Sequence, residues 1–173
     1  MAAVQNNIVI LNEVEAKFAS NTQVIVASGG VSTIQAGTPT KGADAAAASW
    51  TGAVIPMVDG DGSTSQRFTG IAKSTSTDTA SADGVVTLWL PFPGLVYACK
   101  SKDLTATDTA AEINALFGKR VVFDLTSSLW SIDTAATDAV ANCVVIVGGD
   151  YNTSTVWFVY ATHGSMLNFS ISA

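Results

Sequence analysis

Turn-forming residues recur at short intervals along this chain and leave room only for short strands between them. Gly37-Thr38-Pro39, Asp59-Gly60-Asp61-Gly62, Asp83-Gly84 and Pro91-Phe92-Pro93-Gly94 each combine residues that bend the backbone. The segments between these turns are apolar and rich in β-branched and aromatic residues, as β-strands are. The spacing therefore predicts a mainly β protein, with antiparallel strands arranged as a β-sandwich or a barrel-like domain.

Most strands after residue 30 can be placed by the apolar residues between turn signals. The alanine-rich segment Lys41–Ser49 fits a helix and a loop equally well, and Gly148–Ser154 is predicted as a polar turn. The predicted strands are Val31–Ala36, Gly52–Val58, Arg67–Thr77, Val85–Pro91, Leu95–Lys100, Lys119–Thr126, Leu129–Ile132, Asn142–Val147, Thr155–Ala161 and Leu167–Ile171.

One short α-helix is specified at about residues 108–117. Thr109 and Glu112 have the spacing of a capping box, in which each side chain bonds the backbone N–H of the other residue. Gly118 is placed to end the helix in a left-handed conformation. Its buried face is expected to contain Ala110, Ile113, Leu116 and Phe117, which recur at spacings of three and four residues.

The first 30 residues follow a different pattern from the rest. Ile8–Leu11 and Val24–Ala27 fit short strands, and Asn12–Phe18 fits a short helix between them. We interpret residues 1–30 as an N-terminal arm or added subdomain and residues 31–173 as the β-rich domain.

Composition and charge exclude several classes of partner. Charged residues make up only 13% of the chain and the net charge is −6, with eight basic residues spread along it. Nucleic acids and anionic membranes both require clustered Lys and Arg, so neither is an expected partner.

The longest apolar runs have the length of a strand, which is too short to span a bilayer. The N-terminus shows no export signal, so we expect synthesis in a cytoplasm.

No arrangement of residues points to catalysis, a metal or a cofactor. His163 is the sole histidine and stands in a predicted turn without the motif of a nucleophile beside it. The Asp59-x-Asp61-Gly62 segment resembles the start of a calcium loop but lacks the closing carboxylate, which favours a plain turn. Cys99 and Cys143 are expected to be two buried thiols. The chain is therefore predicted not to be an enzyme.

Two strands are apolar on both faces, which indicates either a core between two sheets or a partner subunit. These strands are Val85–Leu90 and Thr155–Tyr160, and the sequence does not separate the two alternatives. Their tryptophans, Trp89 and Trp157, are candidate interface residues, and Phe92 in the neighbouring turn is a third. The four tryptophans, Trp50 and Trp130 included, fit core and interface anchors better than sugar-stacking residues.

The order of the segments resembles that of tailed-phage capsid decoration proteins, also called cement or auxiliary head proteins. Ile34–Pro39 is similar to a family phrase, Ile-x-Ala-Gly-Thr-Pro, although Thr40 and Lys41 replace the usual Leu and small residue. Phe68–Ala72 resembles a later family strand, and Thr109–Leu125 resembles its helix–Gly–strand unit. The remaining segments that match in order are Val85–Leu90, Pro93–Ala98, Ile132-Asp133, Val144–Ile146 with Asp150, and Val156–Tyr160.

This resemblance covers residues 28–162 and implies a structural virion protein of a bacteriophage. Members of the family sit on the outer capsid surface, often as homotrimers, and stabilise the head by binding the major capsid protein. They have no catalytic residues to assign here. The alternatives are another virion component, such as a head-fibre base, a tail-tube subunit or a fibre domain, and a carbohydrate-binding β module.

Overall fold

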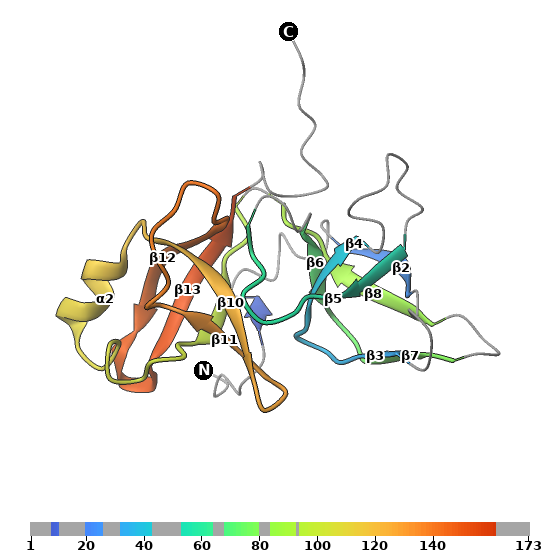
Figure 1. Cartoon of the computed structure of the whole chain (residues 1–173), viewed down its shortest axis with the longest axis horizontal. Helices are drawn as coiled ribbons and strands as arrows, with labels where there is room; N and C mark the ends of the chain where they lie inside the picture. Colours follow the sequence, from blue (N-terminus) through green and yellow to red (C-terminus); the bar gives the residue numbers. More distant parts are fainter. Residues whose placement is uncertain are drawn as a thin grey trace, which may run out of the picture.

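The protein is mainly β, with antiparallel sheets and one α-helix among the residues that the structure describes. The computed structural model describes residues 8–10, 20–25, 32–42, 53–63, 68–79, 84–92 and 94–161. The strands form two β-units that lie side by side (Figure 1). This confirms the fold class predicted from the turn spacing. The predicted segments Asn12–Phe18 and Leu167–Ile171 lie outside the described residues, as do Trp50 and His163.

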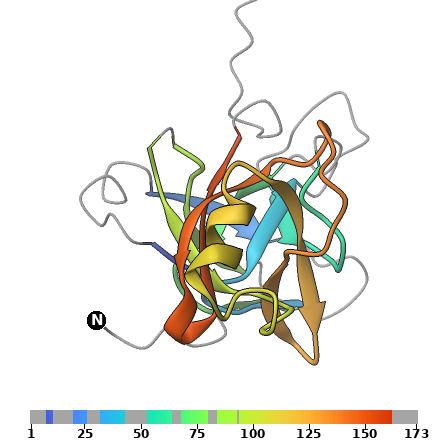
Figure 2. The ribbon, with the colours of Figure 1, turned by 90° about the vertical axis from the view of Figure 1, so that its left-hand side faces the viewer.

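The first unit is a curled, six-stranded antiparallel sheet with strand order β1-β9-β13-β12-β10-β11. Helix α2 packs against β12 at one end of this unit (Figure 2). A single turn of 3-10 helix, η2 (Tyr151–Thr153), joins β12 to β13. The strands are β1 (Val9–Ile10), β9 (Tyr97–Lys100), β10 (Arg120–Thr126), β11 (Leu129–Asp133), β12 (Val144–Asp150) and β13 (Thr155–Tyr160).

The second unit is a barrel in which five strands pair in a closed ring, in the order β2-β5-β4-β6-β8. All its pairings are antiparallel except the one between β2 and β5. Strands β3 (Ser32–Ile34) and β7 (Ser76–Asp78) form a separate two-stranded ribbon. The barrel strands are β2 (Ser20–Ile25), β4 (Pro39–Gly42), β5 (Ala53–Pro56), β6 (Phe68–Ala72) and β8 (Val85–Trp89).

The described strands of residues 1–30 are paired with the rest of the fold. Strand β1 pairs with β9, and β2 pairs with both β8 and β5. These two strands therefore belong to the two β-units, although the sequence suggested an arm or added subdomain for this segment.

Helix α2 (Ala110–Leu116) forms where the capping box predicts it. The Glu112 backbone N–H donates to the Thr109 hydroxyl, and the Glu112 carboxylate accepts from the Thr109 backbone N–H at 3.0 Å. Gly118 has φ of 81°, the left-handed conformation expected after the helix. The prediction for Phe117 was wrong: its ψ of 126° ends the helix at this residue, and its ring is 69% exposed. Ala110 is exposed as well, so the buried face consists of Ile113 and Leu116.

Three further predictions are corrected. Strand β4 forms at Pro39–Gly42, where the sequence indicated a turn followed by a loop or helix. The predicted strand Arg67–Thr77 is divided into β6 and β7 by a bend. Strand β12 continues through Gly148-Gly149, where a turn was expected, with a bulge between Ile146 and Gly148.

One hydrophobic core joins the two β-units. Phe68 of the barrel stacks on Tyr160 of β13 with ring centroids 4.1 Å apart, and Phe123 of β10 lies 6.0 Å from Phe68. Met57 and Ile71 of the barrel side belong to the same buried cluster as Phe158. A smaller cluster fills the barrel itself with Ile34, Val54, Ala72, Val86 and Leu88. The doubly apolar strand β8 therefore serves two cores, since Val86 and Leu88 face the barrel interior while Trp89 packs against the shared core.

Residues 60–63, which we call the wedge, fill the gap where β10 and β12 separate. Strand β10 pairs with β12 only at Arg120 and Val121. Farther along, the Gly60 N–H donates to the Phe123 carbonyl, and the Phe123 N–H donates to the Asp61 carbonyl. The Cys143 N–H donates to the Gly62 carbonyl at 2.8 Å. The wedge thus supplies backbone partners that β10 and the start of β12 do not give each other.

Gly62 is required in the wedge, and its replacement should destabilise the protein. Its φ is 130°, and an added Cβ would lie 3.2 Å from the Val122 Cα and 3.3 Å from the Phe123 nitrogen. We expect Gly62→Ala to lower the free energy of unfolding by about 1–3 kcal/mol, measured by urea denaturation. Gly60→Ala is the matched control, because Gly60 also has positive φ but no atom within 4 Å of its added Cβ. Equal losses in the two variants would show that the wedge does not restrict space at Gly62.

Candidate interaction surface

The three aromatic residues predicted as interface candidates occupy different environments. Phe92 lies in the loop between β8 and β9 and is 56% exposed, while Trp157 on β13 is 37% exposed. Trp89, the last residue of β8, is half-buried and packs against the shared core. Two of the three are therefore available on the surface, and the interface role of all three stays a prediction.

Trp157 is held on the outer side of the curled sheet by a small neighbour on the adjacent strand. In β13, Val156, Phe158 and Tyr160 are buried, whereas Trp157 points to the opposite face. Its cross-strand partner is Gly148 of β12, and a Cβ added there would lie 3.1 Å from the indole Cε3. The ring therefore lies over the backbone of Gly148, which no other residue type would allow without displacing it.

Phe92 is exposed from a turn whose backbone is fixed at both ends. Its N–H donates to the Leu90 carbonyl at 2.8 Å, and its carbonyl accepts from the Leu95 N–H at 3.1 Å. The Leu90 carbonyl also accepts a hydrogen bond from the buried Tyr97 hydroxyl at 3.1 Å. These bonds fix the backbone on the Leu90 side of Phe92, which lowers the entropy that a partner must remove on binding.

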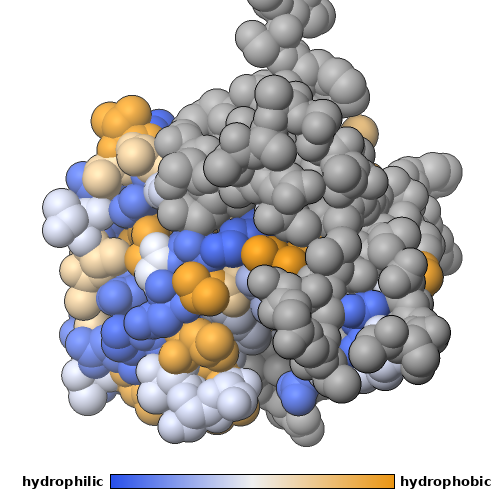
Figure 3. All heavy atoms as spheres, turned by 45° about the vertical axis from the view of Figure 1, so that its right-hand side comes forward, coloured by the Kyte–Doolittle hydropathy of each residue, from blue (hydrophilic) through white to orange (hydrophobic). Residues whose placement is uncertain are grey.

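Sequence reasoning missed several other large apolar side chains that reach the surface. Leu104 and Tyr151 lie at the same end of the curled sheet, where the Ser154 hydroxyl donates to the Leu104 carbonyl. The sequence signal that could have identified Leu104 as exposed is its position in a polar segment. On the face drawn in Figure 3, apolar groups of the described surface form separate patches among polar ones. The exposed set is Val58, Val85, Phe92, Leu104, Phe117, Leu129, Val140, Tyr151 and Trp157.

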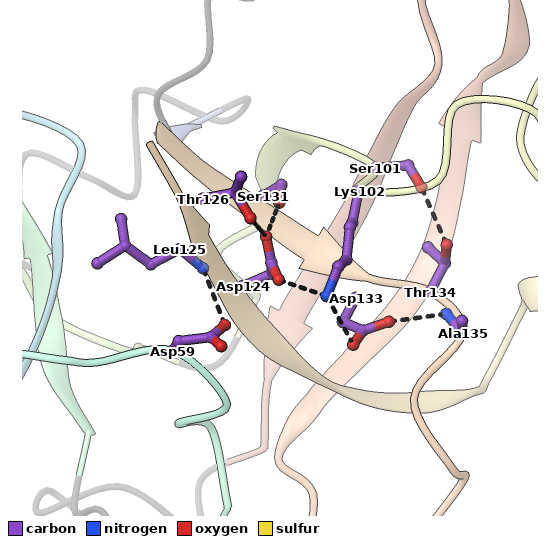
Figure 4. Close-up of polar contacts among 10 residues, drawn as sticks. All are labelled: Asp59, Ser101, Lys102, Asp124, Leu125, Thr126, Ser131, Asp133, Thr134 and Ala135. Carbon is purple, nitrogen blue, oxygen red and sulfur yellow. Dashed lines mark hydrogen bonds and ion pairs between the residues drawn. The ribbon is translucent and has the colours of Figure 1, made fainter. Parts of the chain in front are cut away.

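A polar network closes the curled sheet where its last strand, β11, meets the residues that follow β9 (Figure 4). Ser101 forms an isolated parallel bridge with Ile132, and the Lys102 N–H donates to the Ile132 carbonyl at 2.9 Å. The Ser101 and Thr134 hydroxyls lie 2.9 Å apart. We call this junction the β9–β11 seam.

The charged centre of the seam is Asp124, whose side chain is 3% exposed. The Lys102 ammonium lies 2.6 Å from one Asp124 oxygen and 3.6 Å from an Asp133 oxygen. The other Asp124 oxygen accepts from the Thr126 and Ser131 hydroxyls, both at 3.0 Å. Burial alone would raise the pKa of Asp124, but these bonds to the carboxylate outweigh burial and hold the pKa below its ordinary value of 3.8. Both oxygens of the Asp124 carboxylate are already bonded within the protein, so this side chain has a structural role.

The two aspartates of the calcium-like segment also make structural contacts. One Asp59 oxygen accepts from the Leu125 N–H at 3.1 Å. Asp61 accepts from the Val58 N–H at 2.8 Å and pairs with the Lys41 ammonium at 2.7 Å. These contacts fasten the wedge to β10 on one side and to barrel strand β4 on the other.

Both cysteines are buried thiols, as the sequence indicated. The Cys99 Sγ lies 3.4 Å from the Trp130 carbonyl, at the seam. Burial raises the pKa of the Cys99 thiol to about 12, which keeps it protonated and unreactive at neutral pH. Burial also raises the pKa of Cys143.

The described residues include no group of three or more His, Cys, Asp or Glu side chains that could hold a metal ion. Within the same part of the chain, every helix is too short or too polar to cross a membrane. Comparisons with protein-family models, with curated proteins and with solved structures found no match.

Replacing Asp124 should weaken the protein at neutral pH but much less in acid. Because the folded state lowers the pKa of Asp124, its contribution is complete above the ordinary value and disappears as pH falls through the folded value. We expect Asp124→Asn to lower the free energy of unfolding by about 1–3 kcal/mol near pH 7. The difference from wild type should shrink near about pH 3.

Urea denaturation followed by circular dichroism at the two pH values measures this difference. Asp138→Asn is the control and should show little effect at either pH, because Asp138 is exposed and asparagine keeps the oxygen that accepts from the Arg120 N–H. A gap between Asp124→Asn and wild type that stays constant with pH would contradict the assigned role of the Asp124 charge.

Proposed function

We propose that this protein is a capsid decoration protein, which binds the major capsid protein on the outer surface of a tailed-phage head and stabilises the shell. The observation that carries the proposal is the presence of exposed aromatic side chains on a β-fold with few charges. Phe92 is exposed beside its hydrogen bonds to Leu90 and Leu95, and the Trp157 ring lies next to Gly148 of the adjacent strand. Such side chains are typical anchors of protein interfaces.

The arrangement of the segments that resemble the decoration family supports the same proposal. Ile34–Pro39 runs from β3 into β4, and Phe68–Ala72 forms β6, which contributes to both cores. The helix–Gly–strand unit corresponds to α2, Gly118 and β10. The segments thus form consecutive strands and the helix of one fold, which leaves turns and sheet faces for contacts.

Low charge is compatible with attachment to a protein shell. Ion pairs engage some of the basic residues inside the fold, as with Lys41 to Asp61 and Lys102 to Asp124. A net charge of −6 gives the protein no attraction to packaged DNA or to an anionic membrane. We therefore propose neither as a partner, and we place the protein outside the capsid after synthesis in the host cytoplasm.

Self-association into a homotrimer would strengthen attachment. A capsid presents equivalent sites around symmetry axes, and a symmetric oligomer engages several of them at once. Avidity then exceeds the affinity of any single contact. We propose that the surface with Trp157 or Phe92 provides part of the contact with a second copy or with the capsid.

The proposal predicts that capsids lacking this protein bind it, and that surface aromatic residues determine the affinity. We expect Phe92→Ser or Trp157→Ser to raise the Kd for such capsids by at least about tenfold, because truncated aromatic anchors typically cost about 2 kcal/mol or more. Co-sedimentation with purified capsids measures binding, and light scattering on a sizing column measures the oligomer. Val140→Ser is the control, since Val140 is 82% exposed in a different loop.

Several outcomes would reject the proposal. A monomer that ignores capsids lacking it is not a decoration protein. Electron-microscopic localisation to the tail or to fibres would identify another virion component. Binding to glycans that Trp157→Ser abolishes, without capsid binding, would identify a carbohydrate-binding β module.

A further inference from the structure

The β10–β11 hairpin has fewer backbone bonds to its neighbouring strands than the rest of the curled sheet has, although its apolar side chains lie in the shared core. Strands β12 and β13 pair along nearly their whole lengths, and β13 pairs with every residue of β9. The hairpin is joined to β12 only through Arg120 and Val121 at its base, with the wedge adding bonds at Phe123. On its other side, β11 meets the β9 extension through the isolated Ser101–Ile132 bridge.

Side chains rather than a continuous ladder of backbone bonds reinforce this side of the hairpin. The Lys102 ammonium binds Asp124 of β10 and Asp133 of β11, so one cation spans both strands (Figure 4). The Lys102 side chain is 47% exposed while that of Asp124 is 3% exposed. Water therefore reaches the Lys102 ammonium, and its contact with Asp124 can be broken from that side.

The thiol of Cys99 lies directly beneath the seam and can report whether the seam opens. The Cys99 thiol is fully buried and bonds the Trp130 carbonyl on the edge of β11 that faces away from β10. Trp130 packs edge-on against Phe123 in the shared core, with ring centroids 6.2 Å apart. Movement of β11 away from β9 would remove the cover of Cys99 without requiring β9, β13 or β12 to separate.

We propose that the β9–β11 seam is a conformational latch: breaking the contacts of Lys102 with Asp124 and Asp133 lets β11 move away from β9 while Phe123 keeps β10 in the shared core, and this movement uncovers Cys99. Local opening of this kind occurs where a segment has few bonds to its surroundings. The latch is independent of the capsid-binding proposal.

Acid should also release the latch. The charged groups at the seam are Lys102, Asp124 and Asp133, with Asp59 bonded to the next residue of β10 and Lys119 bonded to the Thr134 carbonyl. Protonation of Asp124 removes the closer of the two anions that hold Lys102. Opening is therefore expected as pH falls through the lowered pKa of Asp124, and not between neutral and mildly alkaline pH, where the ammonium stays charged.

The test compares the rates at which the two thiols react with a dipyridyl disulfide in the folded, full-length protein. Peptide mass spectrometry assigns the modification to Cys99 or Cys143. When reclosing is faster than labelling, each rate is proportional to the population of the open state that exposes the thiol. We expect Asp124→Asn to accelerate the labelling of Cys99 by roughly tenfold or more. Because the seam opens without global unfolding, Cys99 should react faster than Cys143, and its rate should depend less steeply on added urea.

A second buried ion pair provides the matched control. Asp61→Asn breaks the contact with Lys41 at the wedge, where the Cys143 N–H bonds Gly62. This variant should not accelerate Cys99 selectively. If Asp124→Asn does not fold, Lys102→Gln removes the cation from the exposed side of the pair and is expected to act in the same direction.

Lowering the pH of the wild-type protein to about 3 tests the latch without a mutation. Preferential labelling of Cys99 under conditions that preserve the circular dichroism spectrum would support the latch. Equal rates and an equally steep urea dependence for the two thiols would show that only global unfolding exposes them and would overturn it. A Cys99 rate that responds to neither variant nor acid would overturn it as well.

Discussion

The stacking of Phe68 on Tyr160 is the contact that makes the two β-units one structure. Phe68 belongs to the barrel and Tyr160 to the last strand of the curled sheet, and Phe123 extends the same aromatic cluster into β10. A barrel of five short strands encloses little apolar volume, and its own core is correspondingly small. Most of the large buried side chains instead lie in the core that both units share. The barrel therefore depends on the curled sheet for burial that it does not supply itself.

Polar contacts then determine how the units fit around this core. The wedge gives backbone partners to Phe123 and Cys143, and its Asp61 carboxylate reaches Lys41 on the barrel. At the opposite side of β10, Asp124 is surrounded by Lys102 and two hydroxyl groups. In each place a buried carboxylate is paired, because an unpaired one would be costly inside the fold.

Local signals in the sequence predicted local structure well. The Thr109–Glu112 capping box and Gly118 identified the helix, and apolar segments between turn signals identified β10, β11 and β13. Strand β4 was missed because Thr40, Lys41 and Gly42 carry no strand pattern; its formation depends on β5 and β6 on either side. The wedge could not be predicted from local sequence either, because it pairs residues 60–63 with distant partners near residues 123 and 143. For the candidate surface, strand alternation placed Trp157 on its own face but left open whether a sheet or a partner would cover Trp89.

The course of the chain shows how the barrel is connected to the curled sheet. Ile10 of β1 is the register partner of Tyr97 of β9, so the chain leaves the curled sheet and returns to it at adjacent points. Every barrel strand lies between these two positions. In topological terms the barrel is an insertion into a β-sheet whose own strands are discontinuous in sequence. Related proteins could vary the inserted unit in size while the host sheet keeps its pairing, because the entry and exit points need only remain neighbours.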